Sequence, residues 1–330
     1  MATRATRAVG VAVALLLAAA CSGSAGGAQR ATAPARPCPG SGPLLGAPSP
    51  ASDPDPAVRR VDVTFVDRTR ETPATPTRPR TACRVLPVEI RVPAATSRRV
   101  PLVVVVHGLD GDPTSLGPLL DAWAGAGHVV VAPTFPTTVK DVNGRSEPAS
   151  NVGQAHDVSF VVDVLLDAGR EPAALASVRA LVDPQRVGVA GMSLGGQTVY
   201  GLVAHSCCRD GRVDAAIVMA GVYRSLPGGT YVRNRVPVML VQGDADRGYH
   251  NSVRAYPALA APKWFVTLRG ARHSPPFEIP LGRDAPLVRT VTTEFWLRYL
   301  DGDLDAASRI VSAVDATHGA ATLRRDLTAR

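Results

Sequence analysis

A short, unbroken run of apolar and mostly β-branched residues dominates the segment PLVVVVHG, residues 101–108. Such a run fits a strand that is covered on both faces, as in a parallel sheet. Similar runs follow as HVVVAP (128–133), RVGVAG (186–191), DAAIVMAG (214–221), PVMLVQG (237–243) and KWFVTLRG (263–270). Helical stretches are predicted between several of these runs. The chain is therefore predicted to be an α/β protein with a doubly wound, mostly parallel sheet.

Further elements are predicted around these runs. Alternating apolar and polar residues predict half-buried strands at VRRVDVTFVD (58–67) and CRVLPVEIRV (83–92). Helices are expected over residues 115–126, 154–168, from Leu194 onward, and over 287–299. Residues 58–301 form the predicted α/β domain. Residues 302–330 are expected to add a loosely packed helix and a polar tail.

The N-terminus has the pattern of an export signal. Arg4 and Arg7 precede an uncharged stretch that ends in small residues before Cys21, so residues 1–20 are predicted to be a secretory signal peptide. LLLAAAC resembles a bacterial lipobox, which implies that Cys21 is lipidated and holds the protein on the outer face of a membrane. The lipobox usually has Leu where this chain has Ala18, so secretion without a lipid is the alternative.

Composition limits the partners of the exported chain. Residues 21–57 are rich in Gly, Ala, Ser and Pro and are predicted to form a flexible tether. Removal of residues 1–20 takes away two arginines and no acids, so the net charge falls from +8 to +6. Because the positive charge is scattered and not interleaved with aromatics, nucleic-acid binding is not expected. We expect a monomer.

Four cysteines remain after Cys21, and an even count in an exported chain predicts disulfides. Cys38–Cys83 is the preferred pair, and pairing of these two with Cys207 and Cys208 is the alternative. A bond between the adjacent Cys207 and Cys208 is disfavoured because consecutive Cα atoms lie closer than a relaxed disulfide requires. No histidine or second cysteine pair lies at metal-ligand spacing, so neither a metal nor another cofactor is expected.

The motif VAGMSLGG (189–196) puts Ser193 between a predicted strand and a predicted helix. A sharp strand-to-helix turn needs small neighbours, which Gly191, Gly195 and Gly196 supply. The hydroxyl would project above the sheet, beside the positive end of the helix dipole. Ser193 is therefore the candidate nucleophile, and the alternative is an ordinary serine in a glycine-rich helix start.

Two further candidates follow the ends of predicted strands, where functional groups of an open parallel sheet gather. His273, in LRGARHSPPF, is the candidate general base, because a neutral imidazole there can accept the serine proton. Asp246, in VMLVQGDADRGY, is the candidate acid that orients the imidazole, with Asp244 as its rival. His107 also ends a strand, but its position before Gly108 indicates a role in shaping the loop.

An ester carbonyl under attack becomes an oxyanion, which two fixed backbone N–H groups must meet. The residue after the candidate nucleophile, Leu194, supplies one. Leu109, in the HGLDGD loop after the first long apolar run, supplies the other. Only backbone groups are needed, so the apolar side chains are no obstacle.

The order Ser193, Asp246, His273, with the upstream His-Gly loop, resembles the α/β-hydrolase superfamily over about residues 58–300. VVVVHG, VAGMSLGG, QGDADR and GARHS are similar to the dienelactone-hydrolase-like branch, and QAHDVSFVVDVLLD is similar to a helix in bacterial relatives of platelet-activating-factor acetylhydrolase. The resemblance implies nucleophile, orienting acid and base at these three positions, and oxyanion donors at Leu109 and Leu194. Dienelactone hydrolases proper use a cysteine nucleophile, so dienelactone itself is not the expected substrate.

Only residues 222–236 lie between two predicted strands where many relatives insert a helical cap, so no large cap domain is expected. Residues 134–153 are the candidate for a rim or partial lid. The sequence thus predicts an exported serine esterase that acts on small or lipid-like esters through an acyl-enzyme. An acyltransferase or peptidase on the same residues, and a non-catalytic surface-binding lipoprotein, are the alternatives.

Overall fold

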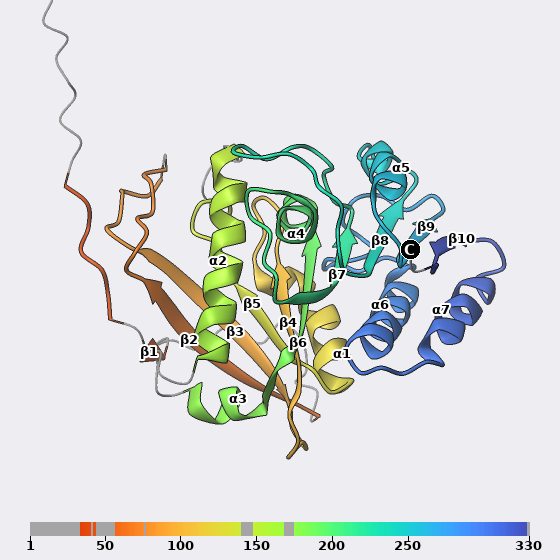
Figure 1. Ribbon diagram of the computed structural model, residues 1–330, viewed down its shortest axis with the longest axis horizontal. Coiled ribbons are helices and arrows are strands. Elements are labelled where there is room, and N and C mark those ends of the chain that lie inside the picture. Colours follow the sequence, from red (N-terminus) through yellow and green to blue (C-terminus); the bar gives the residue numbers. More distant parts are fainter. Residues whose placement is uncertain are drawn as a thin grey trace, which may run out of the picture. The chain divides into compact units, whose positions relative to one another are not determined.

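The computed structural model describes residues 34–40, 42–43, 57–75, 77–139, 148–167 and 175–328 (Figure 1). The predicted signal peptide and the lipidation candidate Cys21 lie outside these residues. All elements below belong to the unit formed by residues 35–330. Among the described residues, no helix has both the length and the apolar character needed to cross a membrane.

The strands of this unit form one sheet, in the order β1-β2-β3-β5-β4-β6-β7-β8-β9-β10. Their bounds are β1 Gly42–Pro43, β2 Val58–Asp67, β3 Arg84–Pro93, β4 Val100–Val106, β5 Val129–Pro133, β6 Val182–Met192, β7 Val213–Met219, β8 Val238–Gly243, β9 Lys263–Leu268 and β10 Ala321–Asp326. The strands from β5 to β9 run parallel to one another. The remaining pairings, at both edges of the sheet, are antiparallel. The predicted doubly wound, mostly parallel sheet is confirmed.

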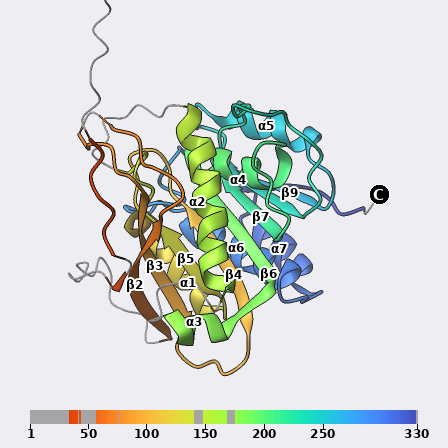
Figure 2. The same cartoon turned by 60° about the vertical axis from the view of Figure 1, so that its left-hand side comes forward.

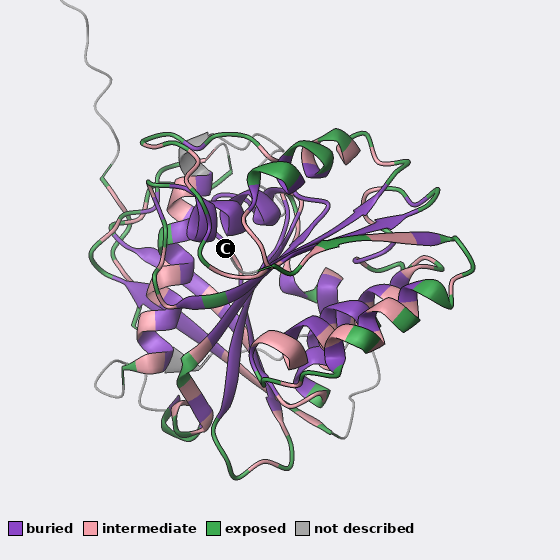
Figure 3. Cartoon of the chain, turned by 45° about the vertical axis from the view of Figure 1, so that its right-hand side comes forward, coloured by how far each residue is buried: buried purple, intermediate pink, exposed green. Residues whose placement is uncertain are grey.

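Helices cover both faces of the sheet (Figures 1 and 2). They are a 3₁₀ turn at Pro113–Leu116 and α1 Gly117–Gly125, α2 Pro148–Leu166, α3 Ala176–Leu181, α4 Leu194–Ala204, α5 Tyr249–Ala258, α6 Ala285–Tyr299 and α7 Ala306–Asp315. Side chains alternate along each strand, so Val104 packs in one core with α2 to α5, whereas its neighbour Val105 packs in the other with α1, α6 and α7. Figure 3 shows the buried strands between helices whose outer faces are exposed.

Part of the predicted tether is attached to the domain. Residues 35–40 lie beside the segment that leads into β3, where the Arg36 N–H donates a hydrogen bond of 2.9 Å to the Arg80 carbonyl oxygen. The Cys38–Cys83 disulfide, with 5.7 Å between Cα atoms, is the pair that the sequence favoured. The expected flexible tether of residues 21–57 is therefore fixed at its centre.

The C-terminal residues differ from the predicted loose helix and polar tail. Helix α7 buries Ala306, Ile310 and Val314. Residues 321–326 then form β10, which pairs antiparallel with β9 along its whole length. The sheet thus continues beyond the predicted end of the domain at residue 301. The sequence did not predict this strand, because backbone hydrogen bonds to β9 hold it and its residues have no apolar pattern.

The connection between β7 and β8 is short, and it is the place where a cap domain would be inserted. Residues 220–237, between β7 and β8, contain no helix, which confirms the absence of a large cap there. The predicted rim or lid at residues 134–153 falls partly outside the described residues, because only 134–139 and 148–153 are described. The latter six residues are the first part of α2.

Candidate active site

Ser193 occupies a sharp turn between β6 and α4. Its φ of 56° lies in the left-handed region that non-glycine residues rarely adopt. Two glycines make the turn possible: a Cβ on Gly191 would collide with the Gly195 backbone, and one on Gly195 would collide with the carbonyl oxygen of Val106. The predicted strand-to-helix turn is present, and it holds Ser193 at the N-terminus of α4.

His273 and Asp246 lie together at the carboxyl ends of β9 and β8. Nδ1 of His273 is 2.6 Å from Oδ2 of Asp246, whose side chain is 5% exposed. The other oxygen, Oδ1, accepts a hydrogen bond of 2.8 Å from the Gly248 N–H. Both carboxylate oxygens therefore have fixed partners, and the imidazole is oriented by one of them.

Asp244, the rival to Asp246, has a different position. Its carboxylate accepts a hydrogen bond of 2.6 Å from the Gly270 N–H, and a backbone bond of 3.1 Å joins the neighbouring Ala245 to Ala271. Asp244 thus ties the turn after β8 to the turn after β9. Of the two aspartates, only Asp246 contacts the His273 imidazole.

Ser193 and His273 follow strands of the same parallel set, so both lie at the carboxyl ends of these strands. In the described structure, no hydrogen bond joins the Ser193 hydroxyl to the imidazole. Such bonds are often long in the absence of substrate and tighten in the reacting complex. The His273 side chain is 41% exposed, so the imidazole is partly open to solvent.

The loop after β4 runs beside the serine. A Cβ built on Gly108 would lie 3.2 Å from the Ser193 Cβ, which shows how closely this loop passes. Within the described residues, the backbone N–H groups of Leu109 and Leu194 donate to no protein acceptor. The two residues that the sequence singled out thus carry N–H groups without a described acceptor, one directly after Ser193 and one directly after Gly108.

His107 fixes the shape of this loop. It is buried, its Nδ1 lies 2.7 Å from the Gly108 carbonyl oxygen, and its Nε2 accepts the Phe135 N–H at 3.0 Å. These partners require the neutral ring with its proton on Nδ1. Burial lowers the pKa of His107 to about 4, so the ring stays neutral near pH 7. The predicted loop-shaping role agrees with these contacts.

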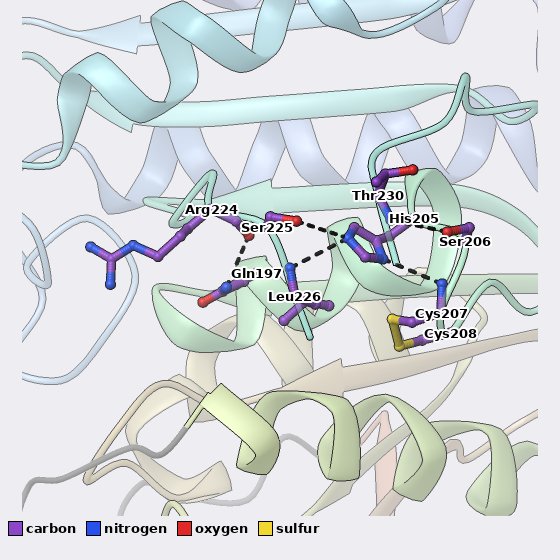
Figure 4. The surroundings of a disulfide bond; sticks show 9 residues. All are labelled: Gln197, His205, Ser206, Cys207, Cys208, Arg224, Ser225, Leu226 and Thr230. Carbon is purple, nitrogen blue, oxygen red and sulfur yellow. Dashed lines mark hydrogen bonds between the residues drawn. A yellow bond between two sulfur atoms is a disulfide. The ribbon is translucent and has the colours of Figure 1, made fainter. Parts of the chain in front are cut away.

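The connection between β7 and β8 is fixed at two places in its first half. Near its start, the Val222 N–H donates to the Ser193 carbonyl oxygen at 3.3 Å. Farther along, the His205 ring contacts Ser225 and the Leu226 N–H, each at 3.3 Å (Figure 4). The connection is therefore held against α4 and the turn that follows this helix.

The turn after α4 contains a disulfide between the adjacent Cys207 and Cys208, which the sequence argument disfavoured. The prediction considered only Cα spacing, and here the bond closes at 3.8 Å between Cα atoms (Figure 4). The alternative pairing of Cys38 and Cys83 with these two cysteines is wrong. Nearby, a cavity of about 560 Å³ is lined by residues that include Tyr223, Tyr231 and Lys263, but by none of Ser193, Asp246 and His273.

Gln242 and Ser252 were missed by sequence reasoning. Gln242 is the last polar residue of β8, and its amide nitrogen lies 2.5 Å from Oδ2 of Asp246. Ser252 of α5 donates to the Gln242 side-chain oxygen at 3.0 Å. The only signal in the sequence is a glutamine at the end of an otherwise apolar strand.

Among the described residues, the ten-stranded, mostly parallel sheet has helices on both faces and a serine on the turn after a central strand, which is the architecture of an α/β hydrolase. The model of the dienelactone hydrolase family matches residues 89–256, about half of the chain, and the chain belongs to this family. Membership makes the protein a hydrolase. The matched segment includes Ser193 and Asp246 and ends before His273. No curated protein matches the chain.

Proposed function

We propose that the protein is a serine esterase that cleaves carboxylic esters through an acyl-enzyme. The observation that carries the proposal is the contact of His273 Nδ1 with the buried Asp246 carboxylate, at the carboxyl ends of the parallel strands, where Ser193 precedes α4. This contact leaves Nε2 of the imidazole to face the substrate side. A serine, an imidazole and a carboxylate with these roles form the catalytic group of many unrelated hydrolases.

In the proposed reaction, His273 removes the hydroxyl proton of Ser193 as the oxygen attacks the ester carbonyl carbon. Asp246 holds the tautomer with the proton on Nδ1 and stabilises the imidazolium that forms. The proton then passes to the leaving alcohol, and the acyl group stays on Ser193. Water, activated by the same imidazole, releases the acid and restores the serine.

The oxyanion formed in both steps is assigned to the backbone N–H groups of Leu109 and Leu194. Both lack a protein acceptor among the described residues, so no internal hydrogen bond must break before they donate. Preorganised donors of this kind stabilise the transition state because they need no reorientation as the charge develops. The hydrogen bond between His107 Nδ1 and the Gly108 carbonyl oxygen restrains the peptide plane that carries the Leu109 N–H.

The helix-free connection at residues 220–237 supports a site that is open to solvent. We therefore expect short-chain or otherwise accessible esters, including lipid-like ones, as substrates. A serine nucleophile, where dienelactone hydrolases proper have cysteine, favours simple esters over dienelactone.

An active-site-directed organophosphonate tests the proposal. The wild-type protein should form a covalent adduct at Ser193 and hydrolyse p-nitrophenyl acetate, and Ser193→Ala should lose both reactions. Full esterase activity in Ser193→Ala would overturn the assignment. A wild-type protein that neither reacts with the probe nor turns over any ester would instead favour a binding function. Product analysis with added alcohol or amine acceptors separates hydrolysis from acyl transfer.

We also propose that the protein is exported and acylated at Cys21. The Arg4–Arg7 pattern and the lipobox-like LLLAAAC support this location. Two disulfides fit an oxidising compartment outside the cytoplasm. Metabolic labelling with an alkyne fatty acid should tag the wild-type protein in the membrane fraction. Cys21→Ser should lose the tag, and a labelled Cys21→Ser protein would refute acylation at this residue.

A further inference from the structure

Besides His273, the Asp246 carboxylate has a second side-chain partner, which the proposed reaction does not use. Oδ2, the oxygen that faces His273 Nδ1 at 2.6 Å, also accepts a hydrogen bond of 2.5 Å from the side-chain amide of Gln242. Two donors therefore converge on one oxygen, while Gly248 holds the other. With three donors and a side chain that is almost fully buried, the carboxylate has little freedom to rotate.

The orientation of Gln242 is itself determined by a second contact. Its side chain is fully buried, and its oxygen accepts a hydrogen bond of 3.0 Å from the hydroxyl of Ser252, which is also fully buried. An ionised carboxylate only accepts hydrogen bonds, so the amide nitrogen must face Asp246. The Ser252 hydroxyl, which has the amide oxygen as its acceptor, stabilises this orientation and disfavours the flipped one.

Resting on the proposed function, we propose that Gln242 is a positioning residue of the catalytic group and that Ser252 holds it in place. Gln242 does not touch the substrate. It acts by fixing the plane of the Asp246 carboxylate and by sharing the negative charge of Oδ2 with the imidazole. The chain of contacts therefore runs from α5 through Ser252, Gln242 and Asp246 to His273.

This arrangement has a definite consequence for proton transfer. A hydrogen bond to an ionised carboxylate draws charge density from the oxygen that accepts it. Without Gln242, more of the charge on Oδ2 would face the imidazole, and the protonated imidazolium would be favoured. The free enzyme would then hold its base in the inactive, protonated form up to a higher pH. A purely structural glutamine would affect stability but not this balance.

The test compares Gln242→Leu with the wild type in p-nitrophenyl acetate hydrolysis across pH. Rates are normalised to active sites by organophosphonate titration. We expect kcat to fall about ten- to a hundred-fold, the range typical of a lost hydrogen bond to a charged group, with KM little changed. The acid limb of kcat/KM should move to higher pH. An unchanged kcat, or a lower kcat with an unmoved acid limb, overturns the proposal.

Thr292→Val is the matched control for loss of a buried polar contact. Thr292 is fully buried in α6, and its hydroxyl accepts a hydrogen bond of 3.0 Å from the Trp123 indole. This variant should lower thermal stability without moving the acid limb. If Thr292→Val moves the acid limb of kcat/KM as far as Gln242→Leu does, the shift follows from any lost buried hydrogen bond, and the proposal fails.

Ser252→Ala keeps the proposal testable if Gln242→Leu does not fold. It leaves the amide in place but removes the group that orients it. We expect a smaller loss of kcat than in Gln242→Leu, with the acid limb displaced in the same direction. An unmoved limb in Ser252→Ala counts against the proposal. If the wild type itself fails to react with the organophosphonate, the serine-esterase assignment has failed, which is a separate result.

Discussion

Nδ1 of His273 lies 2.6 Å from Oδ2 of Asp246, although the two residues are 27 positions apart in the chain. Strands β8 and β9 are parallel neighbours, so the turns that follow them meet at one edge of the sheet. Asp244 and the Ala245–Ala271 backbone bond join these turns directly. Strand pairing and the turns therefore bring the two residues together, and the buried Asp246 carboxylate gives the exposed imidazole a fixed partner.

The two aspartates of this turn should differ sharply in their effect on catalysis. Asp246→Asn places an amide against Nδ1 and favours the wrong imidazole tautomer, so kcat should fall by about 10⁴-fold, as for the equivalent change in serine proteases. Asp244→Asn keeps an oxygen that can accept the Gly270 N–H and should leave kcat nearly unchanged. Steady-state kinetics of the two variants on p-nitrophenyl acetate compare them. Equal losses would contradict the assignment of Asp246.

The serine turn should not tolerate a side chain at Gly195. Gly195→Ala puts a Cβ against the carbonyl oxygens of Val106 and His107, which are backbone atoms that cannot move aside cheaply. We expect a loss of about 1–3 kcal/mol in the free energy of unfolding, typical of overpacking, together with loss of activity. Gly211→Ala, where a Cβ would meet nothing within 4 Å, is the control. Urea denaturation measures both, and a Gly195→Ala protein as stable as Gly211→Ala would show that the turn is looser than described.

Acid should weaken the fold through His107. Its pKa is about 4 in the folded state and about 6.5 when unfolded, so the unfolded state binds the additional proton between these values. The contribution of the neutral ring is present above about pH 6.5 and is lost as the pH falls toward 4, by up to about 3 kcal/mol. His107→Gln should therefore lose less stability than the wild type between about pH 7 and pH 4.5. Urea titrations of both proteins at the two pH values measure this difference. If the free energy of unfolding depends on pH in the same way in both, His107 is not the source of the acid sensitivity.

The two disulfides should contribute unequally to stability. Cys38 and Cys83 are 45 positions apart, and closing a loop of that length stabilises the fold by about 4 kcal/mol in the chain-entropy model. The Cys38→Ser/Cys83→Ser double variant should show most of this loss in urea unfolding. The Cys207→Ser/Cys208→Ser double variant removes a bond between neighbours and should lose far less by this mechanism. The reverse order would mean that the turn after α4 depends on its disulfide more than the N-terminal segment does.

The sequence predicted the elements whose apolar pattern matches their burial. The continuous run at β4 and the alternation at β2 both correspond to observed strands, because burial on two faces or on one leaves a distinct pattern. Helix α5 and strand β10 were not predicted. The polar sequence YHNSVRAYPA contains a proline, and ATLRRD has no apolar run, so tertiary contacts decide both structures.

The site could be predicted as far as strand ends determine it. Ser193, Asp246 and His273 each follow a strand, and their type and order predicted the catalytic roles that are proposed for them. The side-chain contacts within the turns could not be predicted from the positions of the strand ends. Whether Asp246 or Asp244 faces the imidazole depends on how the turn after β8 folds, and the role of Gln242 depends on a serine that lies in the unpredicted α5.

Strand β10 is an edge strand of the sheet that the described residues form, and its outer side affects whether a second molecule can pair with it. Arg324 and Arg325 are exposed and lie over the rings of Tyr256 and Trp264 on opposite faces. A strand from a second molecule that docked along this rim would have to accommodate two guanidinium groups, one above and one below its backbone. Charged side chains on an open edge discourage such lateral growth into aggregates. This border therefore disfavours the addition of a strand from a second molecule along β10.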